Sequence, residues 1–167
     1  MKIAGCVWKF PQDDINTDQI RRKNYAHLPL KEQALRCMET LDPAFAARVK
    51  PGDIIVAGRN FGMGSSRPAS RSLKNLGISC VIAESINGLF FRNCVNYAFP
   101  AMECPGIADL FSEGDVAQVN FDDGAIRNVT TGKTLKARTL PVKLLDLLQA
   151  GGIYPLLEKQ GIIEPQA

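Results

Sequence analysis

Residues 52–67 read GDIIVAGRNFGMGSSR. Within this stretch, residues 53–58 form a short apolar run, which is typical of a β-strand that is covered on both faces. After Arg59, residues 60–67 read NFGMGSSR, a segment with two glycines, two serines and an arginine. Flexible backbone, hydroxyl groups and a fixed cation beyond a buried strand suit the binding of a small anion, although an ordinary turn has a similar composition.

The residues after this stretch predict a parallel strand–helix unit. Residues 68–77 predict a helix with a proline in its first turn and a glycine at its end. Residues 78–85 predict a second buried strand, and residues 86–98 predict another helix. Strands joined through a helix in this order form a right-handed unit when they are parallel, and ligands bind in the loops at the carboxyl ends of such strands.

The residues before this stretch predict one more strand and a helical region. Residues 3–8 are mostly apolar and predict a strand, which ends at a polar loop. Asn16, Thr17 and Asp18 in this loop favour an Asx-type turn. Residues 30–49 predict a helix in two pieces, broken before Pro43.

The last third of the chain predicts antiparallel hairpins followed by helices. Residues 115–139 contain short alternating runs separated by turn sequences. The Asp-Asp-Gly at 122–124 favours a hairpin turn over a metal-binding loop, because calcium loops need further spaced oxygen ligands. Residues 140–152 and 153–161 predict two helices. The chain, residues 1–167, is therefore expected to be a single α/β domain with a mixed set of strands.

Composition and charge exclude several classes of protein. The formal net charge of +3 is too small for a nucleic-acid footprint. The chain contains no run of 18 apolar residues and no N-terminal apolar segment, so we expect no membrane span and a cytoplasmic location. The five cysteines, Cys6, Cys37, Cys80, Cys94 and Cys104, match no metal-ligand spacing. They are expected to be reduced and mostly buried.

The glycine–serine segment predicts an anion site at the start of a helix. Ser65, Ser66 and Arg67 would lie at a helix N-terminus, where free backbone N–H groups and the helix dipole favour anions. Gly64 and the glycine two residues before it permit positive φ angles and close approach of a ligand to the backbone. The Walker and dinucleotide patterns both fail here. His27 is the only histidine, so a serine–histidine nucleophile has little support.

These motifs together resemble a known family. GDIIVAGRNFGMGSSR, with NTDQI at 16–20 and LFFRNCVNYAFPAMECPG at 89–106, resembles the small subunit of the isopropylmalate dehydratase family, the swivel domain of the aconitase superfamily. The resemblance spans roughly residues 1–150 with motif order and spacing intact. It implies a single swivelling domain with a three-layer β/β/α fold, and a hydro-lyase that dehydrates and rehydrates 2-hydroxy acids.

The resemblance also implies roles for individual residues. Ser65 would be the base that removes a proton from carbon, and Ser66 and Arg67 would hold a substrate carboxylate. Asp18, Thr17 and Gly64 would line the same cleft. Because a serine hydroxyl is a weak base, its oxyanion would need backbone N–H donors and a nearby cation.

A partner subunit is implied as well. In the family, a 4Fe-4S cluster acts as Lewis acid on the departing hydroxyl, and its cysteines belong to a separate large subunit. The present chain lacks such a cysteine set. The resemblance therefore implies that this chain holds no metal or cofactor of its own and is active only with a large iron–sulfur subunit, in leucine biosynthesis.

Two departures from the family pattern leave the substrate open. Residues 68–70 are Pro-Ala-Ser where most members have Glu-His-Ala, and residues 21–29 replace a loop that helps to choose the substrate. Arg21, Arg22 and Lys23 would contact a second carboxylate or be solvated surface. We expect a malate-type diacid, 3-isopropylmalate or a dimethyl- or methyl-substituted malate. The alternative is a non-catalytic anion-binding or regulatory module that has lost the chemistry.

Overall fold

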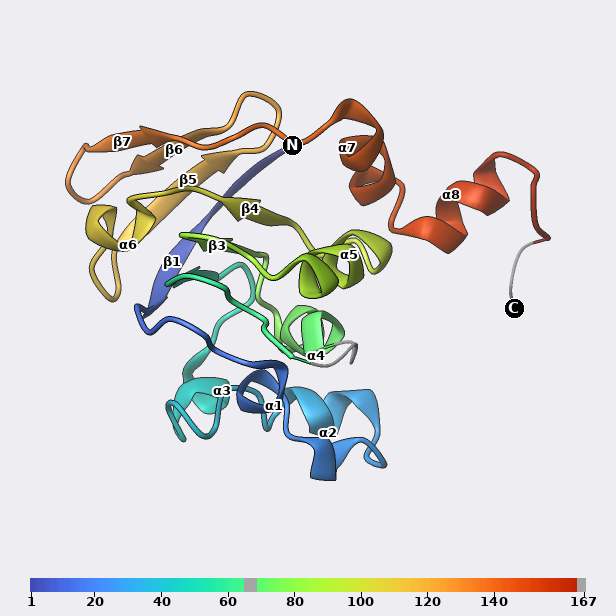
Figure 1. Cartoon of the computed structure of the whole chain (residues 1–167), viewed down its shortest axis with the longest axis horizontal. Coiled ribbons are helices and arrows are strands. Elements are labelled where there is room, and N and C mark those ends of the chain that lie inside the picture. The colour runs from blue at the N-terminus through green and yellow to red at the C-terminus, as the bar shows by residue number, and fades with distance from the viewer. Residues whose placement is uncertain (65–68, 165–167) are drawn as a thin grey trace.

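The computed structural model of the chain describes residues 1–64 and 69–164. Within them the strands form one mixed sheet of seven, in the order β4-β3-β2-β1-β5-β6-β7 (Figure 1). The strands are β1 (Lys2–Phe10), β2 (Ile54–Ala57), β3 (Cys80–Ala83), β4 (Ala101–Glu103), β5 (Val116–Asn120), β6 (Ala125–Asn128) and β7 (Thr134–Lys136). The three strands predicted before residue 90 are confirmed, and so is the α/β class with mixed strands.

Strand β1 changes its partner along its length. Residues 7–10 pair in parallel with β2, whereas residues 2–6 pair antiparallel with β5. At Gly5, beside this change, an added Cβ atom would lie 2.0 Å from the carbonyl oxygen of Gly52. Only glycine fits such an approach of two backbones. β1 therefore joins a parallel half of the sheet to an antiparallel half.

The parallel half is buried on both faces. β2 pairs in parallel with β3, and β3 pairs in parallel with β4. Every residue of β2 and β3 is buried, as their continuous apolar sequences predict. Helices α4 (Ala69–Leu76) and α5 (Gly88–Asn96) follow β2 and β3 and confirm the predicted parallel strand–helix unit.

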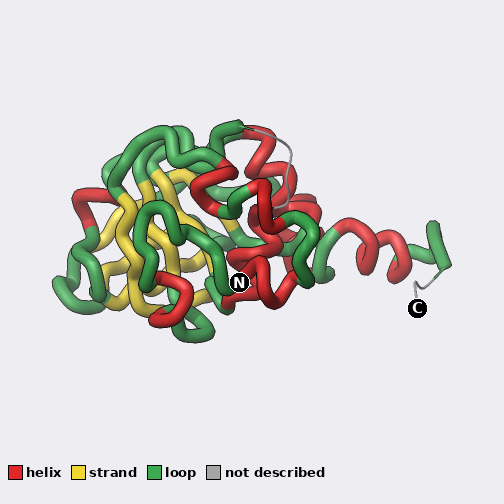
Figure 2. The backbone as a smooth tube through the Cα atoms, turned by 90° about the horizontal axis from the view of Figure 1, so that it is seen from below, coloured by secondary structure: helices red, strands yellow, loops and turns green. Residues whose placement is uncertain are grey.

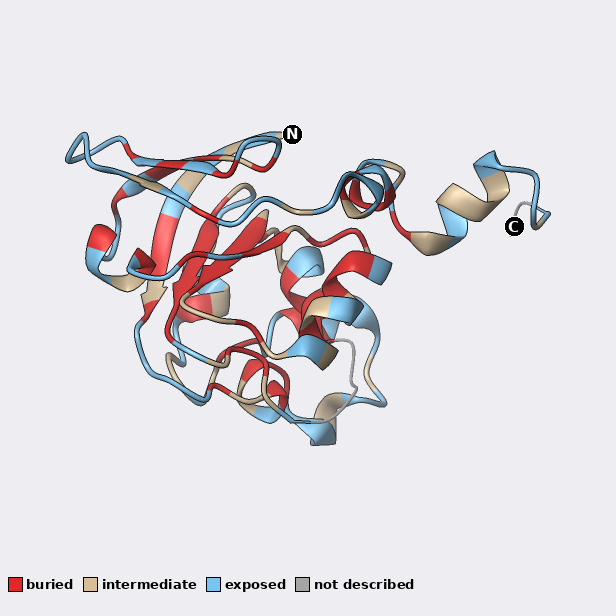
Figure 3. Cartoon of the chain, turned by 45° about the horizontal axis from the view of Figure 1, so that its top comes forward, coloured by how far each residue is buried: buried red, intermediate tan, exposed pale blue. Residues whose placement is uncertain are grey.

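Two hydrophobic clusters lie on opposite sides of the parallel strands. Ile55 of β2 belongs to the cluster that includes residues of α4 and α5, whereas Ile54 and Val56 belong to the cluster that includes residues of β5 and β6. Alternate residues of a strand point to opposite faces. The antiparallel half therefore covers the face opposite the helices, and the three-layer β/β/α arrangement is present. Figure 3 shows the buried strands between the two outer layers.

The helical region before β2 is more broken than predicted. It contains α1 (Thr17–Ile20), a 3-10 turn (Lys23–Tyr25), α2 (Leu30–Ala34) and α3 (Phe45–Arg48). Residues 35–44 form turns instead of continuing the helix predicted over 30–49. Met38 has a φ angle of 59°, which an α-helix cannot contain, and its N–H donates to the Ile20 carbonyl oxygen. A left-handed residue with a tertiary hydrogen bond therefore lies inside the segment that was predicted to be helical.

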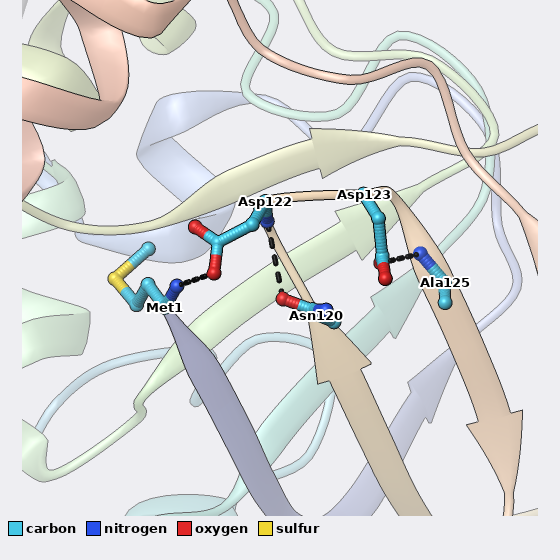
Figure 4. Close-up of polar contacts among 5 residues, drawn as sticks. All are labelled: Met1, Asn120, Asp122, Asp123 and Ala125. Carbon is cyan, nitrogen blue, oxygen red and sulfur yellow. Dashed lines mark hydrogen bonds and ion pairs between the residues drawn. The ribbon is translucent and has the colours of Figure 1, made fainter.

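The last third confirms the predicted hairpins. β5, β6 and β7 pair antiparallel in chain order. The turn between β5 and β6 uses both acidic side chains of the Asp-Asp-Gly sequence: Asp122 pairs with the N-terminal amino group, and Asp123 accepts from the Ala125 N–H at 2.9 Å (Figure 4). The hairpin turn is therefore confirmed. The short strand β4 and helix α6 (Ile107–Leu110) are elements that the sequence pattern did not predict.

Two predicted helices end the described chain. α7 (Val142–Gln149) packs Leu145, Leu147 and Leu148 inward, whereas α8 (Ile153–Lys159) has no buried residue. Figures 1 and 2 both show α8 projecting from the body of the molecule. Among residues 1–64 and 69–164, no helix has the length and apolar character needed to cross a membrane.

Candidate functional site

The loops at the carboxyl ends of β1 and β2 run side by side. The Gly58 N–H donates to the Phe10 carbonyl oxygen at 3.1 Å, the Gly62 N–H to that of Ile15 at 2.8 Å, and the Thr17 N–H to that of Met63 at 2.8 Å. Parallel strands end at the same edge of a sheet, so their loops meet there. These bonds bring the Asn-Thr-Asp sequence and the glycine-rich sequence together, although about forty residues separate them.

A capping box begins α1 at this edge. The Asn16 side chain accepts from the Gln19 N–H at 2.9 Å, and the Gln19 side chain accepts from the Asn16 N–H at 2.9 Å. The sequence favoured a local turn at Asn16, and the structure shows that this turn starts a helix. Thr17 is buried and Asp18 is exposed in the first turn.

Two glycines shape the second loop. Gly62 has a φ angle of 79° and Gly64 has one of 109°, so the expected positive φ angles are confirmed. An added Cβ at Gly62 would lie 2.2 Å from Cγ of Phe90, and one at Gly64 would lie 3.4 Å from Oγ1 of Thr17. Gly62 therefore allows close packing against α5, and exposed Gly64 lies next to Thr17.

The structure brings the predicted site residues Thr17 and Gly64 together at one edge of the sheet, and Asp18 follows Thr17 in the first turn of α1. The predicted base Ser65 and the predicted carboxylate contacts Ser66 and Arg67 lie outside the described residues. The described chain resumes with α4 at Ala69, so the helix predicted to start at residue 68 follows the glycine–serine segment.

A third loop, after β3, contributes residues that the sequence analysis missed. The Phe61 N–H donates to the Ser85 carbonyl oxygen at 3.1 Å, and the Asn87 N–H donates to the Phe61 carbonyl oxygen at 2.9 Å. The Asn87 side chain accepts from the Leu89 N–H at 3.1 Å and caps α5. An asparagine directly before a predicted helix is an N-cap signal that could have identified Asn87.

Arg21 is not the solvated surface residue that one of the two sequence interpretations predicted. It is buried, and its guanidinium donates to the Gln33 side chain, which donates to the Leu28 carbonyl oxygen at 2.6 Å. Arg21 is thus not solvated surface, because α2 folds over it. Arg22, Lys23 and His27 are exposed, as expected of solvated side chains.

The cysteines of this chain do not fit an iron–sulfur cluster. None is in a disulfide, and four are buried, as predicted: Cys37, Cys80, Cys94 and Cys104. Burial raises the pKa of Cys37 and of Cys80 to about 12, which disfavours the thiolate that a metal needs. In the described ranges 1–64 and 69–164, no three His, Cys, Asp or Glu side chains converge as metal ligands.

Two hollows of the described surface lie elsewhere than the contact between Thr17 and Gly64. One of about 1030 Å³ lies on the antiparallel half and is lined by residues such as Lys2, Gln118 and Arg127. Another of about 370 Å³ is lined by Ile86 of the third loop and by Arg138. Neither hollow is lined by Thr17, Asp18 or Gly64.

Known proteins resemble this chain over most of its length. Residues 3–105 match the family described as Aconitase C-terminal domain. The isopropylmalate/citramalate isomerase small subunit of Methanocaldococcus jannaschii is 47% identical over 160 residues, which are 95% of each chain. The 3-isopropylmalate dehydratase small subunit of Heliobacterium modesticaldum is 48% identical over 92% of this chain and 93% of its own. A crystal structure of 3-isopropylmalate dehydratase from M. jannaschii superposes with a TM-score of 0.91, at 36% identity over 98% of both chains.

Proposed function

Because the chain belongs to the Aconitase C-terminal domain family and, within it, to the isopropylmalate dehydratase small subunits, which are hydro-lyase subunits, we propose that it acts on a malate-type 2-hydroxy diacid. The observation that carries this proposal is the meeting of Thr17 and Gly64 at the carboxyl edge of parallel strands. This edge is where α/β folds bind their ligands.

In the proposed reaction, Ser65 removes a proton from the carbon next to the one that loses its hydroxyl. Ser66 and Arg67 hold a substrate carboxylate, since a guanidinium fork matches the two carboxylate oxygens. Thr17, Asp18 and Gly64 line the same cleft. The sequence supports this role, because Ser65 directly follows Gly64, and the Gly64 backbone lies next to Thr17. Backbone N–H groups and Arg67 would stabilise the serine oxyanion.

The substrate that we propose is 3-isopropylmalate, with a dimethyl- or methyl-substituted malate next. The names of the relatives support this order, because several refer to 3-isopropylmalate and one refers to both isopropylmalate and citramalate, a methyl-substituted malate. Residues 21–29 replace the usual substrate-choosing loop, and an assay with each diacid distinguishes among these substrates.

A large subunit that carries a 4Fe-4S cluster completes the proposed enzyme. The relatives are named small subunits, which implies a larger partner. When bound in that partner, the cluster would supply a Lewis acid for the departing hydroxyl. The buried thiols of the present chain, with their raised pKa values, support placing the cluster in the partner.

Two further parts of the proposal concern the whole chain. We propose that residues 1–167 act as one unit, which the relatives' coverage of 95% of the chain supports. We also propose a cytoplasmic location, where cysteines without disulfides are the rule. The alternative of a non-catalytic anion-binding module is not favoured, because relatives at 47% and 48% identity have enzyme names.

The test is reconstitution with the cognate large subunit and a panel of 2-hydroxy diacids. The wild-type chain is expected to turn over a diacid only when the large subunit is present. Ser65→Ala should lower kcat by roughly 10²- to 10⁴-fold with little change in KM, because a general base acts in the transition state. Ser112→Ala, which removes an exposed serine hydroxyl between α6 and β5, is the matched control.

Either of two results would contradict the proposal. Turnover by the small chain alone would show that no partner completes the site. Full kcat in Ser65→Ala, with only a weaker KM, would favour the binding-module alternative.

A further inference from the structure

Asn60 lies where the loops after β1, β2 and β3 meet. It is the third residue after β2 and directly precedes the segment Phe61–Gly64. Its backbone N–H donates to Oγ of Ser85, in the third loop, at 2.9 Å. Its backbone is therefore tied to the loop that leads into α5.

The Asn60 side chain uses both of its polar ends. Nδ2 donates to Oδ1 of Asp14 at 2.8 Å, and Oδ1 accepts from Nδ2 of Asn87 at 3.3 Å. Asp14 belongs to the loop after β1, and Asn87 caps α5. One amide group thus links the ends of β1 and β2 to the start of α5.

The backbone conformation at this point is unusual. Asn60 has a φ angle of 53° and Asp14 has one of 59°. Asparagine and aspartate adopt this left-handed region more readily than most residues. The Asp14 N–H donates to the Arg59 carbonyl oxygen at 2.9 Å, and the Arg59 N–H donates to Oδ1 of Asp13 at 2.7 Å. These bonds hold the backbone of Asp14 against Arg59, the residue before Asn60.

The contacts that follow reach the candidate site. Beyond Asn60, Gly62 bonds to the carbonyl of Ile15, and Met63 accepts from the N–H of Thr17. The segment from Asn60 to Gly64 therefore lies between the loops after β1 and β3. A change in the junction at Asn60 would therefore shift Gly64 relative to Thr17.

We propose that Asn60 is a positioning residue of this enzyme: its side chain bridges Asp14 and Asn87 and so sets the place of the Gly62–Gly64 backbone against Thr17. This inference rests on the proposed function, in which the residues after Gly64 carry the base. Asn60 acts through the loop and does not itself contact the reacting atoms.

A charge exchange tests the bridge in the reconstituted enzyme. Asn60→Asp faces the Asp14 carboxylate with a second carboxylate, and kcat is expected to fall by about 10- to 100-fold while KM changes little, since small misplacement of reacting groups is costly. The double variant Asp14→Asn with Asn60→Asp restores a donor and an acceptor across the contact. It should recover most of the lost kcat. A double variant whose kcat is no higher than that of Asn60→Asp alone would overturn the proposal.

A second variant separates the side chain from the backbone conformation. Asn60→Gly keeps easy access to a positive φ angle but removes the bridge. It should lose kcat as Asn60→Asp does. Wild-type kcat in Asn60→Gly would show that position 60 needs only its backbone conformation. Asn120→Ala is the control, because it removes an asparagine turn contact to the Asp122 N–H, in the hairpin of Figure 4.

Hydrogen exchange on the isolated chain distinguishes failure of this inference from failure of the proposed function. In Asn60→Gly, the amides of Gly62 and Thr17 should exchange faster, while the amide of Val119 in β5 should not change. Unchanged exchange at Gly62 and Thr17 would overturn the positioning role. A wild-type complex without activity on any diacid, together with faster exchange in the variant, would reject the proposed function alone.

Discussion

Gly62 shows how one residue sets the distance between a loop and a helix. Its φ angle is 79°, and an added Cβ would lie 2.2 Å from Cγ of the Phe90 ring. Phe90 in turn packs edge-on against Phe61, with ring centroids 5.4 Å apart. The glycine therefore serves two needs, a left-handed backbone and a close approach to α5. The sequence indicated the first need but not the second.

Gly62→Ala is expected to destabilise the chain more than an alanine substitution at another glycine with a similar φ angle. Gly132 has a φ angle of 78° and nothing within 4 Å of its added Cβ, so Gly132→Ala is the matched control. Alanine with a positive φ angle costs about 1–2 kcal/mol, and the clash with Phe90 should add roughly 1–3 kcal/mol. Urea unfolding of the isolated chain measures both. Equal losses would contradict the importance of the contact with Phe90.

The hydrogen bonds of the Asp115 carboxylate should make the stability of the fold depend on pH. It accepts the Ser112 N–H at 2.8 Å and the Asn128 Nδ2 at 2.7 Å, and these bonds lower the pKa of its carboxyl below the ordinary 3.8. The folded pKa is lower than the unfolded pKa. The contribution to stability is therefore present above pH 3.8 and is lost as the pH falls through the folded value.

Removing this carboxylate should make the stability of the chain less dependent on pH at acidic pH. Asp115→Asn is expected to show a smaller decrease in unfolding midpoint than the wild type as the pH falls from about 5 to about 2. Thermal unfolding in a series of buffers measures the two profiles. Asp146→Asn, which removes an exposed carboxylate of α7, should keep the wild-type slope. Parallel profiles for Asp115→Asn and the wild type would refute the linkage.

Among the secondary-structure elements, α1 depends on its cap. It is a single turn, Thr17–Ile20, too short to be stable by itself. The reciprocal bonds between Asn16 and Gln19, and the bond from Thr17 to the neighbouring loop, hold it in place. The helix that carries Thr17 and Asp18 is therefore stabilised by hydrogen bonds at its ends.

Asn16→Ala should lower the free energy of unfolding by about 1 kcal/mol, the usual effect of losing an N-cap. Asn24→Ala provides the comparison, because Asn24 is exposed in the neighbouring 3-10 turn. Chemical denaturation of the isolated chain measures both variants. The interpretation of Asn16 as a cap is wrong if the two variants have the same stability.

Over the whole molecule, burial is uneven between the two C-terminal helices. α7 places Leu145, Leu147 and Leu148 against the body, whereas α8 and the described residues after it contain none that is buried. Gly152, between the helices, would place a Cβ 2.5 Å from the carbonyl oxygen of Asn96. The junction is thus packed against α5, while α8 extends away from it.

Truncation should reveal this difference. A chain ending at Gly152 is expected to lose less than about 1 kcal/mol of unfolding free energy, because none of the described residues that it removes is buried. A chain ending at Pro141 also removes the three buried leucines of α7 and should lose several kcal/mol, at about 1.5–3 kcal/mol for each. Urea unfolding compares the two. A large loss in the longer chain would show that α8 packs on the body in solution.

The sequence by itself determined the elements whose signals are local. The apolar runs of β2 and β3 predicted buried parallel strands, Gly77 and the proline before α4 predicted the ends of that helix, and the Gly-Ser-Ser-Arg motif predicted the family. These elements can be predicted because the apolar period, the conformational preference of glycine and the helix caps each involve residues that are close in the sequence. The pattern also placed the candidate site at the carboxyl edge of the strands.

Only the tertiary structure decided which distant residues share a contact. β1 pairs Lys2 with Asn120, Arg21 is covered by Gln33, and Asn60 bridges Asp14 and Asn87. No local pattern encodes such pairs, because each partner alone is an ordinary polar residue or strand residue. Their meeting depends on the pairing of strands that are distant in sequence and on the side-by-side course of three loops, which are properties of the folded chain as a whole.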